Sequence, residues 1–156
     1  MKYLFTFITL AAFQFCHAQH LPLKLLTSFI DRPVPVVRDS LMAKKWVQHA
    51  ELSGAQNNQL YQTFSYGTKK NKPAEALAWF RIHADDQIVN QLYYQLPGLE
   101  AYTMLLNEVK AISTEKQGVQ TIENNQISSY YQTTDYTFQT IVGGGSYTLM
   151  VMTNKK

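Results

Sequence analysis

The sequence predicts an α+β domain with a mostly antiparallel sheet of about six or seven strands. Two observations lead to this class. Stretches with the alternating pattern of strands occur in runs, and one long apolar stripe at helical spacing divides these runs. Two further apolar segments near the N-terminus predict helices. We therefore expect a central helix packed on one face of the sheet and two N-terminal helices at an edge or in the same layer.

The first N-terminal helix is expected over residues 21–30, where the later apolar residues recur at helical spacing. Residues 31–35 contain two prolines and should break this helix, because a proline pushes the preceding residue towards extended backbone. A second helix is expected over residues 41–50, capped by Asp39 or Ser40. Its apolar stripe consists of Leu41, Met42, Trp46, Val47 and Ala50.

Strands are expected where apolar, aromatic and β-branched residues alternate with polar ones. The long helix is expected over residues 99–112, where apolar residues recur three or four positions apart. Asp85–Asp86 and Gly143–Gly145 are among the turn signals that separate neighbouring strands, as in an antiparallel meander. The expected strands cover residues 59–66, 76–83, 87–95, 119–123, 127–132, 136–142 and 147–153.

The N-terminus predicts a secretory signal peptide. Lys2 gives a positive start, an apolar run follows, and Ala18 is the small residue before an expected cut ahead of Gln19. The run is shorter than the roughly 20 residues of a membrane-spanning helix, so we expect no transmembrane span in the mature chain. The chain would consist of a leader, residues 1–18, and a single α+β domain, residues 19–156, exported to the periplasm or secreted.

Cleavage at this point would also remove Cys16, the single cysteine. The mature chain would then have neither disulfides nor thiol chemistry. A lipid anchor on Cys16 is the alternative, but Gln14 and Phe15 stand where small residues usually precede such a cysteine. The formal net charge is +3 and the basic residues are scattered, whereas nucleic-acid-binding proteins gather them on one face. We expect no nucleic-acid partner, and a solvated turn at residues 69–73.

Few residues are arranged for catalysis or metal binding. Nucleophilic catalysis needs a base, usually histidine, and the mature chain would have only His20, His49 and His83. His20 is expected at a mobile terminus, and His49 near the end of the second helix, where an imidazole interacts favourably with the helix dipole. His83 with Asp85 and Asp86 could bind a metal but is better explained as a polar hairpin tip.

The remaining candidates for chemistry also favour structural roles. The carboxylates are too dispersed along the sequence to pair any two across a cleft. Gly143–Gly145 lies between two expected strands, whereas a phosphate-binding loop leads from a strand into a helix, so a hairpin turn is expected there. We therefore expect no catalytic residue, no cofactor and no metal site.

Tyrosine is the one enriched residue type that suggests a binding surface. Nine of the ten tyrosines follow residue 18, and most lie on expected strands. In each adjacent pair, Tyr93–Tyr94 and Tyr130–Tyr131, the two side chains must point to opposite faces, so one lies away from the main core. A ring with a polar tip suits contact with proteins or sugars, although cross-strand aromatic pairs also stabilise sheets without a ligand. Tyr93, Tyr94, Tyr130 and Tyr131 are our candidate binding surface.

The layout resembles a group of small exported α+β proteins of Bacteroidota. Several features of the sequence carry the resemblance. They are a leader that ends in His17–Gln19, an opening helix through Leu25–Leu26 and Phe29–Ile30, the segment Asp39–Trp46, the Trp79–Phe80 pair, the helix through Tyr102, Leu105 and Ile112, and the closing strand over residues 147–151. The resemblance covers most of the chain and implies export and a single α+β domain. It implies no activity and no functional residues.

Together these observations predict an exported, non-enzymatic domain that binds another protein in the cell envelope or outside the cell. Such a domain should carry an exposed apolar and aromatic patch on its sheet or sheet edge. The alternative is a carrier of a small ligand, with a pocket between the sheet and the helix around Tyr102. An enzyme that uses dispersed carboxylates, as in a hydrolase, is the least favoured class.

Overall fold

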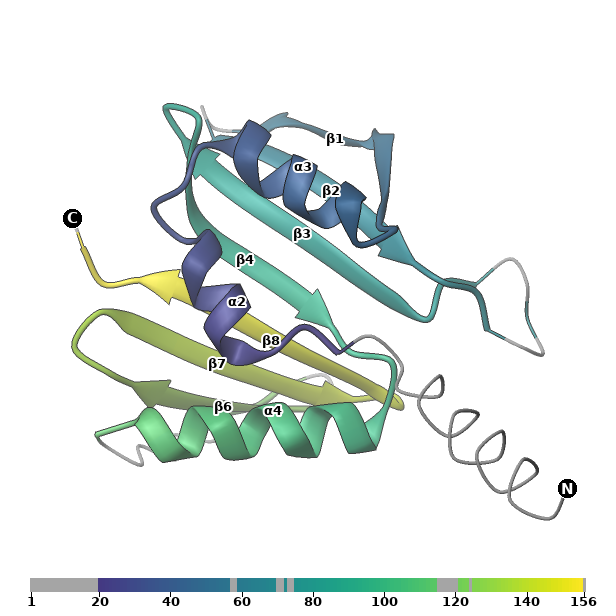
Figure 1. The fold of residues 1–156 in the computed structure, drawn as a ribbon. Coiled ribbons are helices and arrows are strands. Elements are labelled where there is room, and N and C mark those ends of the chain that lie inside the picture. Colours follow the sequence, from purple (N-terminus) through teal and green to yellow (C-terminus); the bar gives the residue numbers. More distant parts are fainter. Residues whose placement is uncertain are drawn as a thin grey trace, which may run out of the picture.

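One antiparallel sheet of eight strands organises the fold, as the computed structural model shows (Figure 1). The structure describes residues 20–56, 59–69, 72, 75–114, 121–123 and 125–155, so the expected leader lies outside the described residues. The α+β class and the mostly antiparallel sheet are confirmed. The elements are α2 Leu23–Phe29, α3 Val34–Ala43, β1 Val47–Gln56, β2 Gln59–Tyr66, β3 Ala78–Asp85, β4 Ile88–Gln95, α4 Leu99–Ile112, β5 Thr121–Glu123, β6 Gln126–Gln132, β7 Tyr136–Gly143 and β8 Ser146–Thr153.

The sheet consists of two meanders that meet at its middle. The strand order is β1-β2-β3-β4-β8-β7-β6-β5, so each meander has four strands and the last strand of each lies next to the other. At this junction Gln91–Gln95 of β4 pairs with 148–152 of β8. Helix α4 connects the two meanders, and the final strand of the chain therefore lies in the interior of the sheet.

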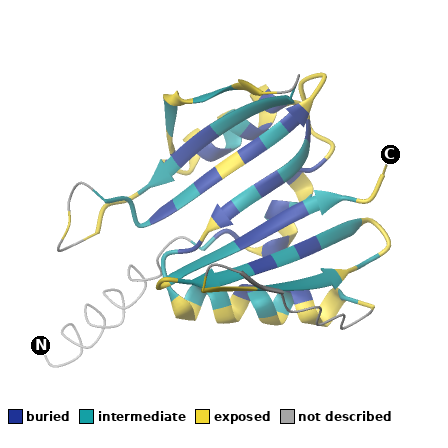
Figure 2. Ribbon diagram, turned by 180° about the vertical axis from the view of Figure 1, so that it is seen from behind, coloured by how far each residue is buried: buried dark blue, intermediate teal, exposed yellow. Residues whose placement is uncertain are grey.

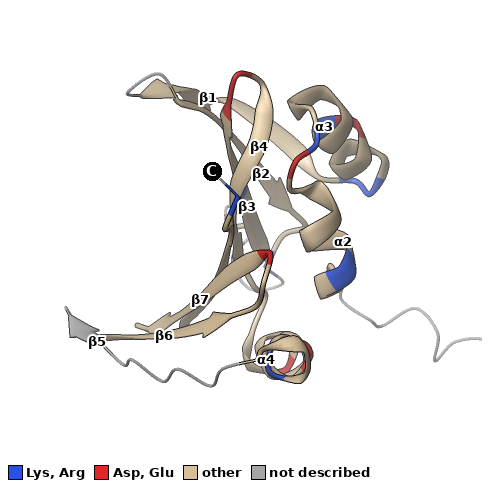
Figure 3. Ribbon diagram, turned by 90° about the vertical axis from the view of Figure 1, so that its left-hand side faces the viewer, with Lys and Arg blue, Asp and Glu red and all other residues tan. Residues whose placement is uncertain are grey.

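All three described helices lie on the same face of the sheet (Figure 1). Viewed from the side, both ends of the sheet bend away from the helices, so the helix-free face is concave (Figure 3). Side chains that point towards the helices form the core, and on β3 buried residues alternate with more accessible ones along the whole strand (Figure 2). The largest fully buried side chains are Tyr94, Phe64, Phe80 and Phe138.

The second helix and the first strand differ from the prediction. Helix α3 occupies Val34–Ala43 rather than 41–50, with Pro33 at its N-cap and Pro35 in its first turn. Helix α2 ends at Phe29, so the break expected at residues 31–35 is present. A proline in the first turn lacks an N–H that would have no intrahelical partner, so the same prolines also start α3. The residues that follow form β1, which adds a strand to the sheet. None of the described helices is long and apolar enough to cross a membrane.

Two hairpins have the tight turns that their sequences favour. The β3–β4 turn places Asp86 at φ 47° and Gln87 at φ 66°. The β7–β8 turn places Gly144 at φ 57° and Gly145 at φ 75°. Two consecutive left-handed residues define the turn whose twist matches antiparallel strands. The glycine run is therefore a hairpin turn, as predicted.

Helix α4 is joined to the N-terminal region through a carboxylate. Helix α2 has Pro22 at its N-cap and no side-chain cap from that residue. The Leu23 N–H, the first of the helix, donates instead to Glu108 Oε2 on α4 at 2.8 Å. Glu108 thus provides the acceptor that the helix N-terminus lacks locally.

Candidate functional site

The helix-free face of the sheet, here called the open face, presents side chains in rows that cross the strands. Residues paired across an antiparallel sheet point to the same side, so the register defines each row. One row crosses from β2 to β6 and contains Thr63, Arg81, Tyr93, Met150, Gln139 and Tyr130. The neighbouring row contains Ser65, Trp79, Gln95, Thr148, Ile141 and Ser128.

The four candidate tyrosines divide between the two sides of the sheet. Tyr93 and Tyr130 lie in the same row of the open face, and both are partly exposed. Tyr94 is 0% exposed and belongs to the core, so it forms no surface. Tyr131 packs against the core from the other side. The candidate binding surface is therefore reduced to Tyr93 and Tyr130, because alternation directs the second member of each pair inwards.

A hollow of about 640 Å³ opens on the open face. It lies over β2, β3, β4 and β8, on the side opposite to α4, and not between the sheet and that helix. Its lining combines aromatic, aliphatic and polar residues: Leu52, Thr63, Trp79, Phe80, Arg81, His83, Tyr93, Gln95 and Thr148. A second hollow of about 430 Å³ also includes His83 and is otherwise lined by Gln56, Gln59, Tyr61 and Asp85.

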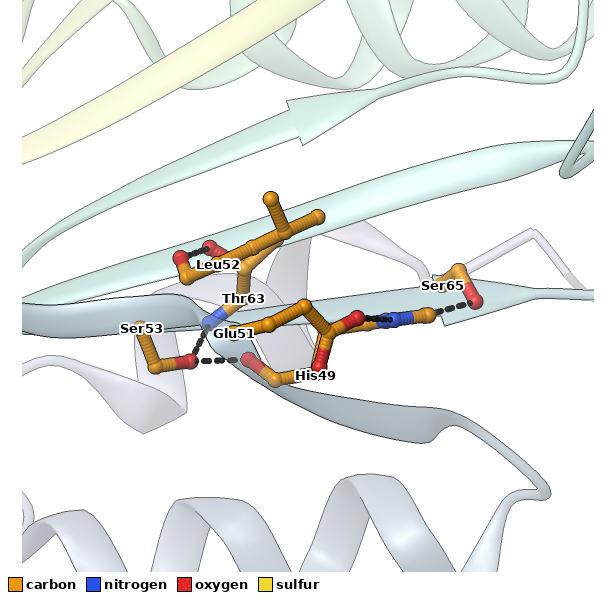
Figure 4. Close-up of polar contacts among 6 residues, drawn as sticks. All are labelled: His49, Glu51, Leu52, Ser53, Thr63 and Ser65. Carbon is orange, nitrogen blue, oxygen red and sulfur yellow. Dashed lines mark hydrogen bonds and ion pairs between the residues drawn. The ribbon is translucent and has the colours of Figure 1, made fainter.

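An irregular part of β1 contributes Leu52 to the lining of the first hollow, and Figure 4 shows the polar contacts of this segment. The pairing of β1 with β2 is interrupted between His49 and Gly54. Ser53 Oγ replaces the missing ladder contacts, because it donates to the His49 carbonyl at 2.6 Å and accepts from the Thr63 N–H at 3.0 Å. Thr63 Oγ1 donates to the Leu52 carbonyl at 2.7 Å. The bulge thereby holds Leu52, which is 42% exposed, beside the hollow.

His49 lies on β1 and not at the end of a helix, which corrects the prediction. Its Nδ1 is 2.8 Å from Glu51 Oε1 and its Nε2 is 2.8 Å from Ser65 Oγ (Figure 4). The imidazole also packs on Trp79, with the ring centroids 5.3 Å apart. Both ring nitrogens are engaged, so His49 fixes the position of the indole. Backbone and His49 hydrogen bonds lower the pKa of the exposed Glu51 carboxyl.

Arg81 supplies a positive charge to the hollow. Its Nε donates to Thr63 Oγ1 at 2.9 Å, and its guanidinium carbon lies 5.4 Å from the centroid of the Tyr61 ring. Thr63 is only 4% exposed, so the arginine is held by a buried hydroxyl. Within the described part of the chain, no carboxylate forms an ion pair with Arg81.

His83 lies between two aromatic rings at the edge of the same hollow. Its ring centroid is 6.0 Å from that of Tyr61 and 5.3 Å from that of Tyr93. Burial lowers the pKa of His83, the Arg81 charge lowers it further, and Asp85 opposes both. The imidazole is therefore neutral at pH 7. Burial also raises the pKa of Tyr93, whose hydroxyl accepts a hydrogen bond from Gln91 at 2.8 Å.

The described residues contain no group of three or more histidine, cysteine, aspartate or glutamate side chains that could hold a metal ion. Asp85 accepts a hydrogen bond from Asn90, and Asp86 lies in the hairpin turn. His20, which was expected to be mobile, is half-buried with its Nε2 enclosed. Ala18 and Gln19, the expected cleavage site, lie outside the described residues.

The residues that sequence reasoning missed at this site are Leu52, Trp79 and Arg81. Alternation places Trp79, Arg81 and His83 on one face of β3, and this aromatic–cationic–aromatic series was the available signal. Leu52 gave no signal, because its place depends on the bulge. No family model matches the sequence, and no curated protein or solved structure matches it significantly.

Proposed function

We propose that this chain is an exported, non-enzymatic domain that binds another protein in the cell envelope or outside the cell, through its open face. The observation that carries the proposal is the composition of that face. A solvated sheet face usually carries polar side chains, whereas this one carries the partly exposed aromatic residues Trp79, Tyr93 and Tyr130. Aromatic residues are among the types that protein interfaces enrich.

The shape of the open face also supports a binding role. The face is concave and none of the described helices or strands covers it, so a convex partner would contact several strands at once (Figure 3). Tyr93 on β4 and Tyr130 on β6 lie in one row, three strands apart along the sheet order, and both hollows open towards the same side. Tyrosine and tryptophan in such positions are typical of the few residues that dominate binding energy.

Export is supported by the leader pattern and by the resemblance to small exported proteins. Leu21 is 2% exposed and its N–H donates to the Tyr94 hydroxyl, and a cut ahead of Gln19 would leave this contact intact. Mass spectrometry of the protein recovered from its native cells should find an N-terminus at Gln19. An uncut N-terminus, or a lipid on Cys16, would contradict this part of the proposal.

Site-specific crosslinking tests the binding role. A photoreactive phenylalanine analogue replaces Tyr130 on the open face or, as matched control, Met104, which is 54% exposed on α4. The Tyr130 variant should form a defined protein adduct in the native envelope or medium, and Trp79→Ala in the same chain should abolish it. Equal adducts at both positions, or none at Tyr130, would count against the proposal, provided that both variants keep the wild-type circular dichroism spectrum.

A carrier of a small ligand is the second candidate, and the 640 Å³ hollow favours it. This volume falls within the range of ligand sites, roughly 300–1,000 Å³. The ligand would then lie on the open face and not between the sheet and α4. Native mass spectrometry of protein from its own cells distinguishes the two functions, because a carrier retains a small molecule of fixed mass, whereas a protein-binding domain is recovered without one.

A further inference from the structure

Arg81 is presented to the hollow in a fixed position. It lies opposite Thr63 on one side and Tyr93 on the other, in the middle of three neighbouring strands. Its Nε is used by Thr63 Oγ1, which itself donates to the Leu52 carbonyl. These two hydrogen bonds link the guanidinium to the backbone of the β1 bulge, so the orientation of the Arg81 side chain depends on the position of that bulge.

The rest of the guanidinium has no acceptor in the described residues. Asp85, on the same strand, accepts a hydrogen bond from Asn90, and Glu51 on β1 is paired with His49. An arginine offers parallel N–H donors that match the two oxygens of a carboxylate, and with Nε occupied the two Nη groups can supply them. His83 next to it is neutral, so Arg81 is the charge that an incoming anion meets.

Apolar surface surrounds this charge. Leu52, Trp79 and Tyr93 line the same hollow, and the Trp79 ring is held by His49. A free inorganic ion would leave these side chains without a partner. A ligand with both an anionic group and an apolar body would satisfy the arginine and cover the rings at once.

We propose that the hollow binds a carboxylate carried on a small apolar or aromatic body, with Arg81 receiving the carboxylate and Trp79, Tyr93 and Leu52 contacting the body. This inference goes beyond the protein-binding role and does not depend on it. Two kinds of ligand can present such a carboxylate, a free organic acid and a peptide.

Nuclear magnetic resonance titration of the full chain tests the proposal with defined probes. The first is 3-phenylpropionate, and its control is the uncharged amide of the same shape. The acid should shift the Arg81 Nε–H and Trp79 indole resonances and bind at least tenfold more tightly than the amide. Arg81→Met should weaken acid binding at least tenfold. Arg81→Lys should weaken it less, because lysine keeps the positive charge but lacks the two parallel N–H donors of arginine. Arg32→Met, at an exposed arginine outside the open face, is the matched control and should change nothing.

Two further probes identify the source. A short peptide that ends in phenylalanine is compared with its C-terminal amide, and tighter binding of the free-carboxylate peptide than of 3-phenylpropionate assigns the site to a peptide terminus. The reverse order assigns it to a free acid. Equal binding of acid and amide, unchanged affinity in a folded Arg81→Met variant, or equally tight binding of inorganic phosphate would each overturn the proposal.

Discussion

Replacing Tyr94 separates a core role from a surface role, because this tyrosine was a surface candidate and lies in the core. Its ring packs against Trp46 and Phe80, with centroid distances of 6.0 and 5.9 Å. Truncation of a fully buried aromatic side chain costs about 3–5 kcal/mol, so Tyr94→Ala should lose that much free energy of unfolding. Tyr94→Phe removes only the hydroxyl, whose contact with the Leu21 N–H is long at 3.5 Å, and should cost less than about 1 kcal/mol.

The hydroxyl should matter at alkaline pH. Burial raises the pKa of Tyr94 to about 12, whereas an unfolded tyrosine titrates near 10. The folded state therefore holds the proton more tightly, and its stability is complete below pH 10 and lost as the pH rises towards 12. At 1.36 kcal/mol per unit, the loss reaches about 1.4 kcal/mol at pH 11. Tyr94→Phe should lack this contribution.

Urea denaturation followed by circular dichroism, at pH 7 and at intervals up to pH 11, measures both effects. Tyr130→Phe on the open face is the control, because it also removes one tyrosine hydroxyl. The difference in unfolding free energy between wild type and Tyr94→Phe should change by about 1.4 kcal/mol between pH 9 and pH 11. The reasoning fails if that difference stays constant, or if Tyr94→Ala costs less than about 1 kcal/mol.

Three other predictions concern the edge of the hollow, the helix contact and a turn. Because the pKa of His83 is lowered in the folded state, the free energy of unfolding should fall as the pH drops through about 6.5. His83→Gln should flatten this dependence of stability on pH between about pH 7.5 and 5. An imidazole of His83 that titrates above about 6.5 by NMR would contradict this. Glu108→Ala leaves the Leu23 N–H without its acceptor and should cost about 1–2 kcal/mol in urea denaturation, and an unchanged midpoint would refute that role. Gly145→Ala should lower the free energy of unfolding by about 1–2 kcal/mol, because Gly145 has φ 75°. The added carbon meets no atom within contact distance, so the cost comes from the backbone conformation and not from a clash. Gly98→Ala, in extended backbone, is the control, and equal costs for the two variants would contradict this explanation.

Local pattern predicted the elements whose residues alternate or recur without interruption. Strand β2 and helix α4 have the bounds expected from their first and last patterned residues. Strand β1 was missed because its pairing is interrupted by the bulge between His49 and Gly54, which destroys the alternation, while Trp46, Val47 and Ala50 happen to fit helical spacing. The pairing of β1 with β2 decides its structure, and such tertiary pairing outweighs local preference.

The site was predictable only in part, for a related reason. Alternation requires that Tyr93 and Tyr94 point to opposite faces, but it does not say which face the helices cover. That choice depends on where α2, α3 and α4 pack, and so on contacts distant in sequence. The hollow depends further on a bulge, a buried threonine and an arginine that come from three different strands.

The position of β8 at the centre of the sheet has a consequence for how the protein is made. Leu149 and Val151, which are 1% and 0% exposed, come from the end of the chain yet complete the core between the two meanders. During synthesis β8 emerges after the other seven strands, so β4 and β7 lack their common neighbour until it appears. Such long-range pairing slows folding, because the two meanders cannot complete one core before β8 joins them.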